Sequence, residues 1–387
     1  MAISSVASAE SPVFHEQLIF PLQDKHVHSS SIVELPNDDL LCCWFHGSGE
    51  RSSPDVMIHG SRLKKGSAAW SPMFPMADTA DFPDLNPVLF VDQNEQLWMF
   101  WITVLAERWD FSMLRYKTST DYLSDGPPKW LWQDHLYFKP GDKFAEVIEQ
   151  GYASPIVTAV APDRDYGSLV RSGESQLIEA SKDLRKRQIG WMPRTHAMIL
   201  PSGRILLPLY SDGYYVGLMA ISDDQGKTWW ASSPIVGVGL NQPTIVRKQD
   251  GTIVAYMREE GEVKHRVLRS ESKDDGETWS VADWTDIPNP NTSLEVIALR
   301  DGLWVMIYND IEDGRDSLAL AVSEDEGDSW TLKHHLEQLA GGKFHYPSII
   351  QTRDGIIHAT YTHQPGSNAQ KSIKHVSFNS AWLKKGD

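Results

Sequence analysis

A two-part pattern of apolar residues recurs along the chain. In each copy, one or two polar residues precede an apolar, β-rich run, and a short turn separates this run from a second one. Four of the turns contain Ser-Gly or Asp-Gly, which favour tight β-hairpins. The six copies begin at His28, Asn86, Arg194, Asn241, Asn291 and His345. Six similar hairpins predict six similar small antiparallel sheets.

A second motif occurs in phase with the hairpins. The pattern S-x-D-x-G-x-[ST]-W is found at residues 222–229, 272–279 and 323–330, so its copies are 50 and 51 residues apart. This period is typical of four-stranded blades that stack around an axis, because one such sheet cannot bury both faces alone. We interpret the motif as a turn in which Asp caps backbone amides, Gly adopts a positive φ and Trp packs between outer strands. The sequence therefore predicts an all-β fold, a six-bladed β-propeller of four-stranded antiparallel blades.

The motif at this spacing resembles the Asp-box (BNR) repeat of the sialidase superfamily, whose members form six-bladed β-propellers. The resemblance covers nearly the whole chain, and it is more specific for the fold than for an activity. A ring of blades has to be closed, and the apolar runs at residues 15–20 and 373–378 are candidates to pair with each other for this purpose.

We expect a single propeller domain over residues 1–387 with one insertion. The number of residues between the second and third hairpins is about twice that between other neighbouring hairpins, so residues 133–190 are more than one blade requires. That stretch is charged and irregular, so we interpret it as an insertion of about 133–190 near the channel mouth. The alternative is a seventh, divergent blade, with strands at residues 155–162 and 175–182.

The candidate site follows from the geometry of the repeats. The inner strands of a propeller all start around one mouth of the axial channel, so the residues that open each repeat should meet there. All of them are polar, and they are His28, Asn86, Arg194 with His196, Asn241 with Gln242, Asn291, and His345 with Tyr346. Exposed strand ends alone would predict Ser, Lys and Glu as readily as this set. We therefore expect a binding or catalytic site at the mouth.

The resemblance implies roles for five residues. Sialidases of this superfamily clamp the substrate carboxylate with three arginines, and Arg258 and Arg315 match the second and third of them. Tyr346 opens the final hairpin and matches the nucleophile. Asp55, in the loop after the first hairpin, matches the acid/base residue, with Glu50 in the same loop as the alternative.

The chain also departs from the superfamily's pattern. His28 stands where the first arginine is expected, and Gln242 replaces the glutamate that activates the tyrosine. No carboxyl group occurs around His363, where one would support the first arginine. A neutral Gln242 cannot take a proton from Tyr346, and His28 lacks the charge of an arginine, so we expect turnover of simple sialosides to be absent or very weak.

The composition and net charge limit the classes of molecule that the protein can bind. The net charge of −16 makes nucleic acid and anionic membrane surfaces unsuitable partners, so an anionic substrate would need a local cluster of arginines. Neither a membrane-spanning run nor an export signal is expected, which leaves a cytoplasmic protein or one whose leader was removed. The two adjacent cysteines, Cys42 and Cys43, cannot form a disulfide framework.

No cofactor or metal is expected. Glycine-rich phosphate loops, nucleophile elbows and dinucleotide-binding motifs are missing from the sequence. His26 and His28 share one face of a strand, but no carboxylate lies at ligand spacing. The expected partner is an acidic oligosaccharide or polysaccharide, and the sequence does not indicate an oligomeric state.

Three functions fit these residues. The first is a sialidase-like exo-glycoside hydrolase acting on a uronate- or sulfate-bearing glycan, with Asp55 as acid and Tyr346 or a water molecule as nucleophile. The second is a polysaccharide lyase, in which a histidine removes the proton next to a uronate carboxylate and Tyr346 protonates the leaving oxygen. The third is a glycan-binding propeller without turnover. The catalytic candidates are Tyr346, Asp55, His28 and His196, and the substrate-binding candidates are Arg258, Arg315, Arg194, Gln242, Asn86 and His345.

Overall fold

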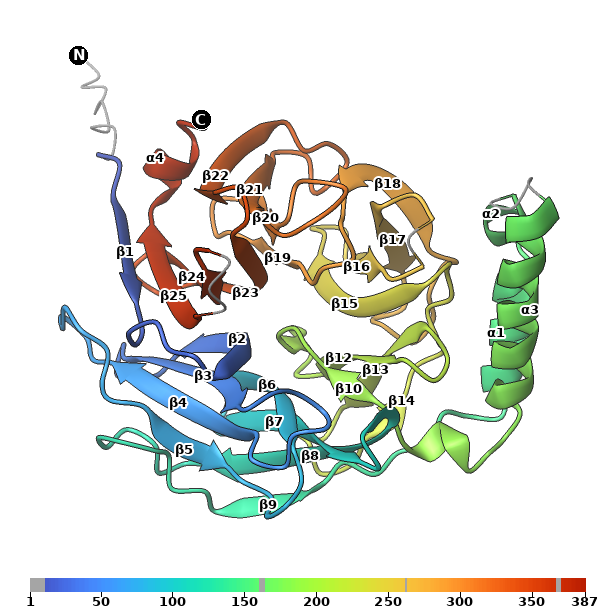
Figure 1. Ribbon diagram of the computed structural model, residues 1–387, viewed down its shortest axis with the longest axis horizontal. Helices are drawn as coiled ribbons and strands as arrows, with labels where there is room; N and C mark the ends of the chain where they lie inside the picture. The colour runs from blue at the N-terminus through green and yellow to red at the C-terminus, as the bar shows by residue number, and fades with distance from the viewer. Residues whose placement is uncertain (1–10, 160–163, 262, 367–369) are drawn as a thin grey trace.

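The chain folds into six sheets arranged around a central axis (Figure 1). The computed structural model describes residues 11–159, 164–261, 263–366 and 370–387. The predicted six-bladed, all-β propeller is confirmed, with antiparallel pairing throughout the blades. The first two blades are β2 (His26–Glu34), β3 (Leu40–Gly47), β4 (Met57–Leu63) and β5 (Phe74–Ala77), then β6 (Asp84–Val91), β7 (Leu97–Leu105), β8 (Arg108–Ser119) and β9 (Trp132–His135).

The next three blades follow the same order, from the axis to the periphery. The third has its inner strand interrupted, so that two short segments, β10 and β11, both pair with β12. The strands are β10 (Met192–Pro193), β11 (Met198–Ile199), β12 (Ile205–Ser211), β13 (Val216–Ser222) and β14 (Trp230–Ala231), then β15 (Leu240–Arg247), β16 (Ile253–Glu259), β17 (Arg266–Ser272) and β18 (Asp283–Pro288), then β19 (Glu295–Ala298), β20 (Trp304–Tyr308), β21 (Ser317–Ser323) and β22 (Leu332–Gln338).

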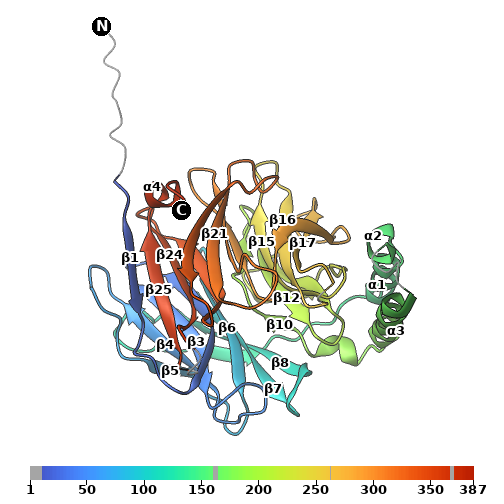
Figure 2. The same ribbon diagram turned by 45° about the horizontal axis from the view of Figure 1, so that its top comes forward.

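The sixth blade joins the two ends of the chain. It contains β23 (Lys343–Gln351), β24 (Ile357–Gln364) and β25 (Ser372–Phe378), and its outer strand is β1 (Phe14–Leu18). β1 pairs antiparallel with β25 from Phe14↔Phe378 to Leu18↔Lys374, and Figure 2 shows the two strands side by side. The predicted closure of the ring by terminal strands is confirmed. A short helix, α4 (Ser380–Leu383), follows, and its cap Asn379 accepts a hydrogen bond from Val13 N.

Side chains tie the inner strands to one another. An innermost strand is a sheet edge, so backbone N–H groups that face the next blade need acceptors other than a ladder partner. Ser31 Oγ accepts from Leu89 N, and Ser348 Oγ accepts from Ile32 N. Thr244 Oγ1 likewise accepts from Val296 N. Each of these bonds crosses from one blade to its neighbour, so the blades are joined by directed bonds as well as by apolar packing.

The Asp-box motifs form the predicted turns. In the first copy, Asp224 accepts hydrogen bonds from both the amide and the hydroxyl of Thr228, at 2.8 and 2.6 Å, and Gly226 has a φ of +81°. Trp229 packs across the blade boundary, with its ring 5.8 Å from that of Phe100. The turns lie at the end of the propeller that carries the hairpin turns of the inner strands, where Lys248 Nζ contacts Asp328 Oδ1.

The seventh-blade alternative is wrong, because the regular structure described after β9 within the surplus residues is helical; residues 160–162 of the expected strand lie outside the described residues. The helical elements are α1 (Phe144–Tyr152), α2 (Pro155–Thr158), α3 (Arg164–Ser181) and a 3₁₀ turn, η1 (Lys186–Gln188). Ser154 accepts from Val157 N and a proline follows it, a helix-start signal that outweighs the apolar run at 155–162. In Figure 1 the helices stand on the outer flank of the third blade. Phe144 is buried there against Trp191 and Tyr214.

A buried pair of histidines lies between β24 and β25. His358 Nδ1 is 3.0 Å from His375 Nε2, and the two rings stack at 5.2 Å between centroids. Burial lowers the pKa of His358 to about 4, and burial together with repulsion from His358 lowers the pKa of His375 to about 3. Both imidazoles are therefore neutral at physiological pH.

This pair predicts a loss of stability in mild acid. Both histidines take up protons near pH 6.5 in the unfolded chain but only near pH 4 and below in the folded one, so unfolding binds protons as the pH falls. The free energy of unfolding should drop below about pH 6.5 by up to about 1.4 kcal/mol per pH unit for each histidine. His375→Phe should reduce this slope in chemical denaturation, whereas His15→Asn, at an exposed position, should not. Equal slopes in all three proteins would contradict the assignment.

Candidate active site

A bulge repeats in the inner strands and orients the residues at the mouth. The register of β6, β15 and β23 shifts by one residue at Asn86, Gln242 and Tyr346, whose φ angles are +50°, +51° and +55°. A positive φ is strained for Gln and Tyr, and such strain concentrates at functional sites. The three side chains join one hydrogen-bonded chain through Tyr210 on β12. Asn86 Nδ2 and Gln242 Nε2 both donate to Tyr210 Oη, and Gln242 Nε2 also lies 3.3 Å from Tyr346 Oη.

The orientation of the Gln242 amide is fixed by Arg258. A guanidinium can only donate, and Arg258 Nη1 lies 3.3 Å from Gln242 Oε1, so the amide NH₂ faces Tyr346. Arg258 Nη1 also donates to Tyr346 Oη at 2.6 Å. The phenol oxygen thus receives two donors, which occupy its acceptor positions, and its own proton must point elsewhere. Gln242 stabilises negative charge on Tyr346, whereas a glutamate there would take its proton.

Three guanidinium groups surround the Tyr346 side chain. Besides Arg258, the Arg194 and Arg315 guanidinium carbons lie 5.1 and 5.7 Å from the centre of the Tyr346 ring. Arg258 pairs with Glu260 at 3.1 Å. Within the described parts of the chain, neither Arg194 nor Arg315 has a carboxylate within 4.0 Å. Arg194 donates to Pro347 O, and Arg315 makes a single long bond, 3.4 Å, to Asn291 O. Burial lowers the pKa of both groups.

A cavity of about 650 Å³ opens beside Arg315. Its lining includes His28, His345, Glu50, Arg315 and other polar residues. The His28 ring lies 3.9 Å from the Tyr346 ring, and its Nδ1 is 3.0 Å from Thr362 Oγ1. Burial, together with neighbouring positive charge, holds the pKa of His28 and of His345 well below the ordinary value. Both are neutral imidazoles that can accept a proton.

The two acidic candidates of the first blade have different surroundings. Asp55 is half-exposed and closes its own loop, because its carboxylate accepts from the amide and the hydroxyl of Ser48, the latter at 2.5 Å. Asp55 does not line the mouth cavity, whereas Glu50 does. Glu50 Oε1 is 3.1 Å from Nε2 of His26, and the other ring nitrogen of His26 is 2.9 Å from Lys371 Nζ.

The contacts of His26 fix where its proton lies. An ammonium group only donates, so Lys371 makes Nδ1 of His26 the acceptor and leaves the proton on Nε2, facing Glu50. Burial alone would raise the pKa of Glu50, but its hydrogen bond with His26 and the charges of Lys371 and Arg315 lower it overall. His26 thus lies between Lys371 and Glu50, with one ring nitrogen close to each of them.

His196 lies apart from the mouth cavity, in the channel. Its Nδ1 is 2.9 Å from Glu295 Oε1 and its Nε2 is 2.8 Å from Ile32 O. Both partners accept, so both ring nitrogens carry protons and the imidazole is charged. Burial alone would lower the pKa of His196, but the charge and hydrogen bonds of Glu295 raise it overall. Glu295 also accepts from Ile349 N, so this ion pair joins the first, third, fifth and sixth blades.

The structure thus brings most of the sequence candidates together, and it separates two of them. Arg258, Arg315, Arg194, Tyr346, Gln242, Asn86, His28 and His345 meet at the mouth, whereas Asp55 faces its own loop and His196 lies in the channel. Sequence reasoning missed Tyr210, Glu260 and Lys371. Tyr210 ends the second apolar run of its repeat and lies as far after the turn glycine Gly203 as Arg258 lies after Gly251, and this equal offset could have found it.

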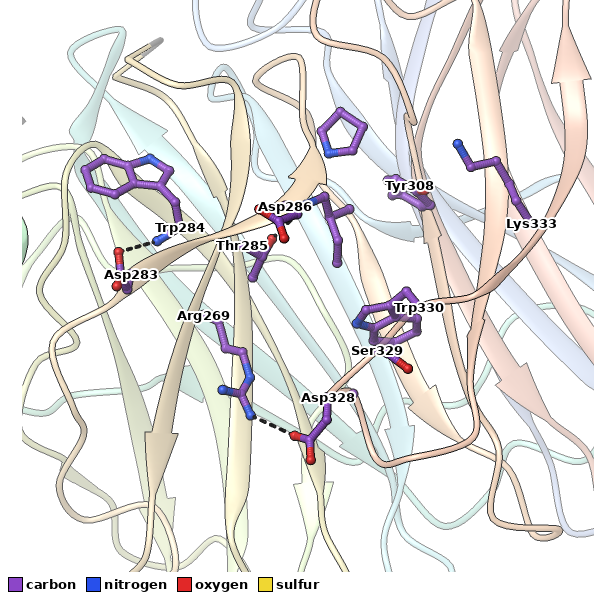
Figure 3. Close-up of a pocket in the computed structure, with 13 residues that line it drawn as sticks. Arg269, Asp283, Trp284, Thr285, Asp286, Tyr308, Asp328, Ser329, Trp330 and Lys333 are labelled. Carbon is purple, nitrogen blue, oxygen red and sulfur yellow. Dashed lines mark hydrogen bonds and ion pairs between the residues drawn. The ribbon is translucent and has the colours of Figure 1, made fainter.

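A second hollow lies away from the mouth. It has a volume of about 710 Å³ and lies between the outer strands of the fourth and fifth blades. Figure 3 shows Arg269 directed at Asp328, 3.8 Å away. Arg269 also pairs with Glu271, and Lys333 pairs with Asp310. Paired charges on the outer wall leave little for a ligand, so the mouth is the better candidate site.

Neither a metal-binding cluster nor a membrane-spanning helix occurs among the described residues. No group of three or more His, Cys, Asp or Glu side chains within the described residues is arranged to hold a metal ion. Across the same residues, no helix is both long and apolar enough to cross a membrane.

Comparisons with known proteins point to one family. The family model described as "BNR repeat-like domain" matches residues 38–194 and 188–359. A sialidase from Micromonospora viridifaciens is 25% identical over 181 residues, which is 44% of this chain and 26% of the relative. A sialidase from Paraclostridium sordellii is 29% identical over 135 residues, covering 30% of this chain and 32% of the relative. The match thus spans about a quarter to a third of these relatives.

Solved structures share the fold at low identity. The NanB sialidase from Streptococcus pneumoniae superposes with a TM-score of 0.70 at 13% identity, over 95% of this chain and 71% of that one. An intramolecular trans-sialidase from Ruminococcus gnavus gives 0.66 at 13% identity, over 93% and 95% of the two chains. A protein of unknown function from Dyadobacter fermentans gives 0.69 at 15% identity, over 94% and 97%.

The contacts of His196 predict a structural role for this residue. His196→Asn should lower the free energy of unfolding by about 3–5 kcal/mol, because it leaves the Glu295 carboxylate buried without its cation. His196→Asn combined with Glu295→Gln should lose less, since no buried charge remains. The raised pKa of His196 means that its contribution is complete below about pH 6.5 and is lost as the pH rises through the folded-state value. Urea denaturation measures all three effects. A stable but inactive His196→Asn protein would instead indicate a catalytic role.

Proposed function

We propose that this chain, which belongs to the BNR repeat-like family, is a sialidase-like exo-glycoside hydrolase. An acidic glycan would bind at the mouth of its channel. The acidic group would be a uronate carboxylate or a sulfate, bound by Arg315 and Arg258. Tyr346 would be the nucleophile, and Arg194 would support the Tyr346 ring from the channel side.

One observation carries the anionic character of the substrate. Arg315 is a largely buried guanidinium that faces the mouth cavity, and no carboxylate in the described residues lies within 4.0 Å of it. Buried charges in proteins are normally paired, because the cost of removing an ion from water has to be offset. In a chain with a net charge of −16, an unpaired arginine at this position is best explained by an anionic ligand. Guanidinium groups bind carboxylates and sulfates with two parallel hydrogen bonds.

The proton for the leaving group would come through Glu50. As Tyr346 Oη attacks the anomeric carbon, its phenol proton passes to the neutral imidazole of His28. The bond from that carbon to the glycosidic oxygen breaks, and the oxygen accepts a proton from Glu50, which holds it only in transit from His26 because the pKa of its carboxyl is lowered. Glu50 is replenished by Nε2 of His26, and His26 in turn by Lys371, whose pKa is lowered by burial. Water then attacks the anomeric carbon and breaks the glycosyl–tyrosine bond; one water proton returns to Glu50 and along the same path, and the departing phenolate recovers its own proton from His28. Asp55, the sequence candidate for the acid, is a weaker choice because Ser48 already holds its carboxylate.

The lyase function stays as a second candidate because of two neutral histidines. His28 and His345 both line the cavity beside Tyr346, and their lowered pKa values leave them able to accept a proton at neutral pH. In that reaction the histidine would remove the proton next to the uronate carboxylate, and the phenol of Tyr346 would protonate the leaving oxygen. The product would carry a carbon–carbon double bond, and no water would be consumed.

A reaction time course on acidic oligosaccharides tests the proposed function. We expect new reducing ends without the ultraviolet absorbance of an unsaturated uronate, released from chain ends. Arg315→Ala should fold normally and lose about tenfold or more in kcat/KM, the effect of removing one charge-assisted contact. Reducing ends together with the ultraviolet absorbance would establish the lyase. Absence of turnover on uronate- and sulfate-bearing glycans alike would contradict both enzymes.

The two carboxylates of the β3–β4 loop give a matched comparison. Glu50→Gln should lower kcat by about a hundredfold or more, because the proton path loses the group that faces the substrate. Asp55→Asn removes the same charge from the same loop and should leave kcat within a few-fold of the parent. A glycoside with a good leaving group should rescue Glu50→Gln, since its oxygen needs no proton. The reverse ranking of the two variants would assign the acid to Asp55.

A further inference from the structure

Two carboxylates and one amide lie directly behind Arg258. Asn241 Nδ2 donates to Asp212 Oδ1 at 3.1 Å and also to Glu260 Oε2. Asn241 Oδ1 accepts from Gln242 N at 3.0 Å, which fixes the orientation of the amide and directs both of its N–H groups at the carboxylates. Asp212 comes from the β12–β13 loop and Glu260 from the end of β16. One side chain therefore bridges acidic groups of two neighbouring blades.

This bridge connects to the substrate-binding side of the mouth. Glu260 Oε2 is 3.1 Å from Arg258 Nη2, and Nη1 of the same guanidinium donates to Tyr346 Oη. Arg258 is 7% exposed, so little water screens these contacts. Asp212, Glu260 and Arg258 together carry a charge of −1 when both carboxylates are ionised, and of zero when one is protonated. The attraction of the mouth for an anion therefore depends on how many protons the two carboxylates hold.

Within this group, Asp212 changes its protonation state in mildly acidic solution. Burial, followed by the charge of Glu260 and that of Asp110 on β8, raises the pKa of Asp212 to about 6, against the opposing effects of Asn241 and Arg258. Tyr215, from the same loop, and Glu260 line a further cavity of about 250 Å³ between the propeller and the helices α1 and α3. Glu260 is thus reached from this cavity as well as from Arg258.

We infer that Asp212, Asn241 and Glu260 form a positioning group behind Arg258 that couples the binding of an anionic glycan to proton uptake, so that the glycan binds more tightly in mildly acidic solution. The inference rests on the proposed function for its ligand. An anion bound at Arg258 and Arg315 adds negative charge near Asp212 and favours its protonated form, and by linkage proton uptake then favours binding.

Calorimetric titration with an acidic monosaccharide, such as glucuronate, across pH tests the coupling. The association constant of the parent protein should fall roughly tenfold between about pH 5 and about pH 7.5. Asp212→Asn keeps an acceptor for Asn241 but removes the charge, so its affinity should stay high and nearly constant over this range. Asp110→Asn removes a nearby charge that is paired with Arg108 and lies outside the bridge, so it should keep most of the parent's pH dependence. Identical pH profiles for the parent and Asp212→Asn would overturn the inference.

A second measurement needs no ligand and no activity. The carboxyl carbon of Asp212, followed by NMR in ¹³C-labelled protein, should titrate near pH 6 in the parent. It should titrate at higher pH in Arg258→Gln, because a favourable positive charge has been removed. Titration near pH 4 with no response to Arg258→Gln would reject the coupling even if acidic sugars bind. The expected response without any binding of acidic sugars would support the coupling and contradict the proposed substrate class.

Discussion

The centre of this propeller depends on an ion pair between two blades that are not neighbours. Six inner strands converge on one axis, and each brings backbone groups that have no ladder partner on the channel side. His196 and Glu295 meet there from the third and fifth blades, and they accept or donate hydrogen bonds at Ile32 and Ile349 of the first and sixth. A contact of this kind can form only across the axis, so it fixes how the blades face each other. The residues at the mouth extend from the same inner strands that this ion pair holds together.

The mouth uses backbone strain to place its side chains. Asn86, Gln242 and Tyr346 occupy the same bulge in three blades, and each takes a left-handed conformation that costs free energy for these residue types. The packing of the blades offsets that cost. The strained conformations place three side chains from distant parts of the sequence in one chain of hydrogen bonds. Arg258 completes this chain and also determines the direction of the Gln242 amide. Gln242 therefore donates to Tyr346 Oη, whereas a carboxylate in its place could only accept.

The fold could be predicted from the sequence because its signals are periodic. Hairpin turns and Asp boxes repeat at fixed spacing, and equal offsets within a repeat become equal places around an axis, which located Arg258, Arg315 and Tyr346 near one another. Residues outside the repeat carry no such signal. Glu50 and Asp55 lie in one irregular loop, where spacing does not tell which carboxylate faces the cavity. Lys371 and Asp212 come from other loops. The helices α1, α2 and α3 were not predicted, because an apolar run was interpreted as a strand although its Ser-Pro start favours a helix.

The pairing of β1 with β25 has a consequence for how the protein is made. Within the propeller, β1 is synthesised before the other strands, but the strand that it pairs with, β25, is synthesised after them. Until then the sixth blade lacks its outer strand, and the inner strands of the first and sixth blades cannot exchange the bond between Ile32 and Ser348. The nascent chain must therefore carry an open arc of blades with exposed sheet edges throughout most of its synthesis, a state in which pairing with other chains competes with completion of the ring. Production of this protein should accordingly depend more on chaperones and on translation rate than the stability of the closed ring would indicate.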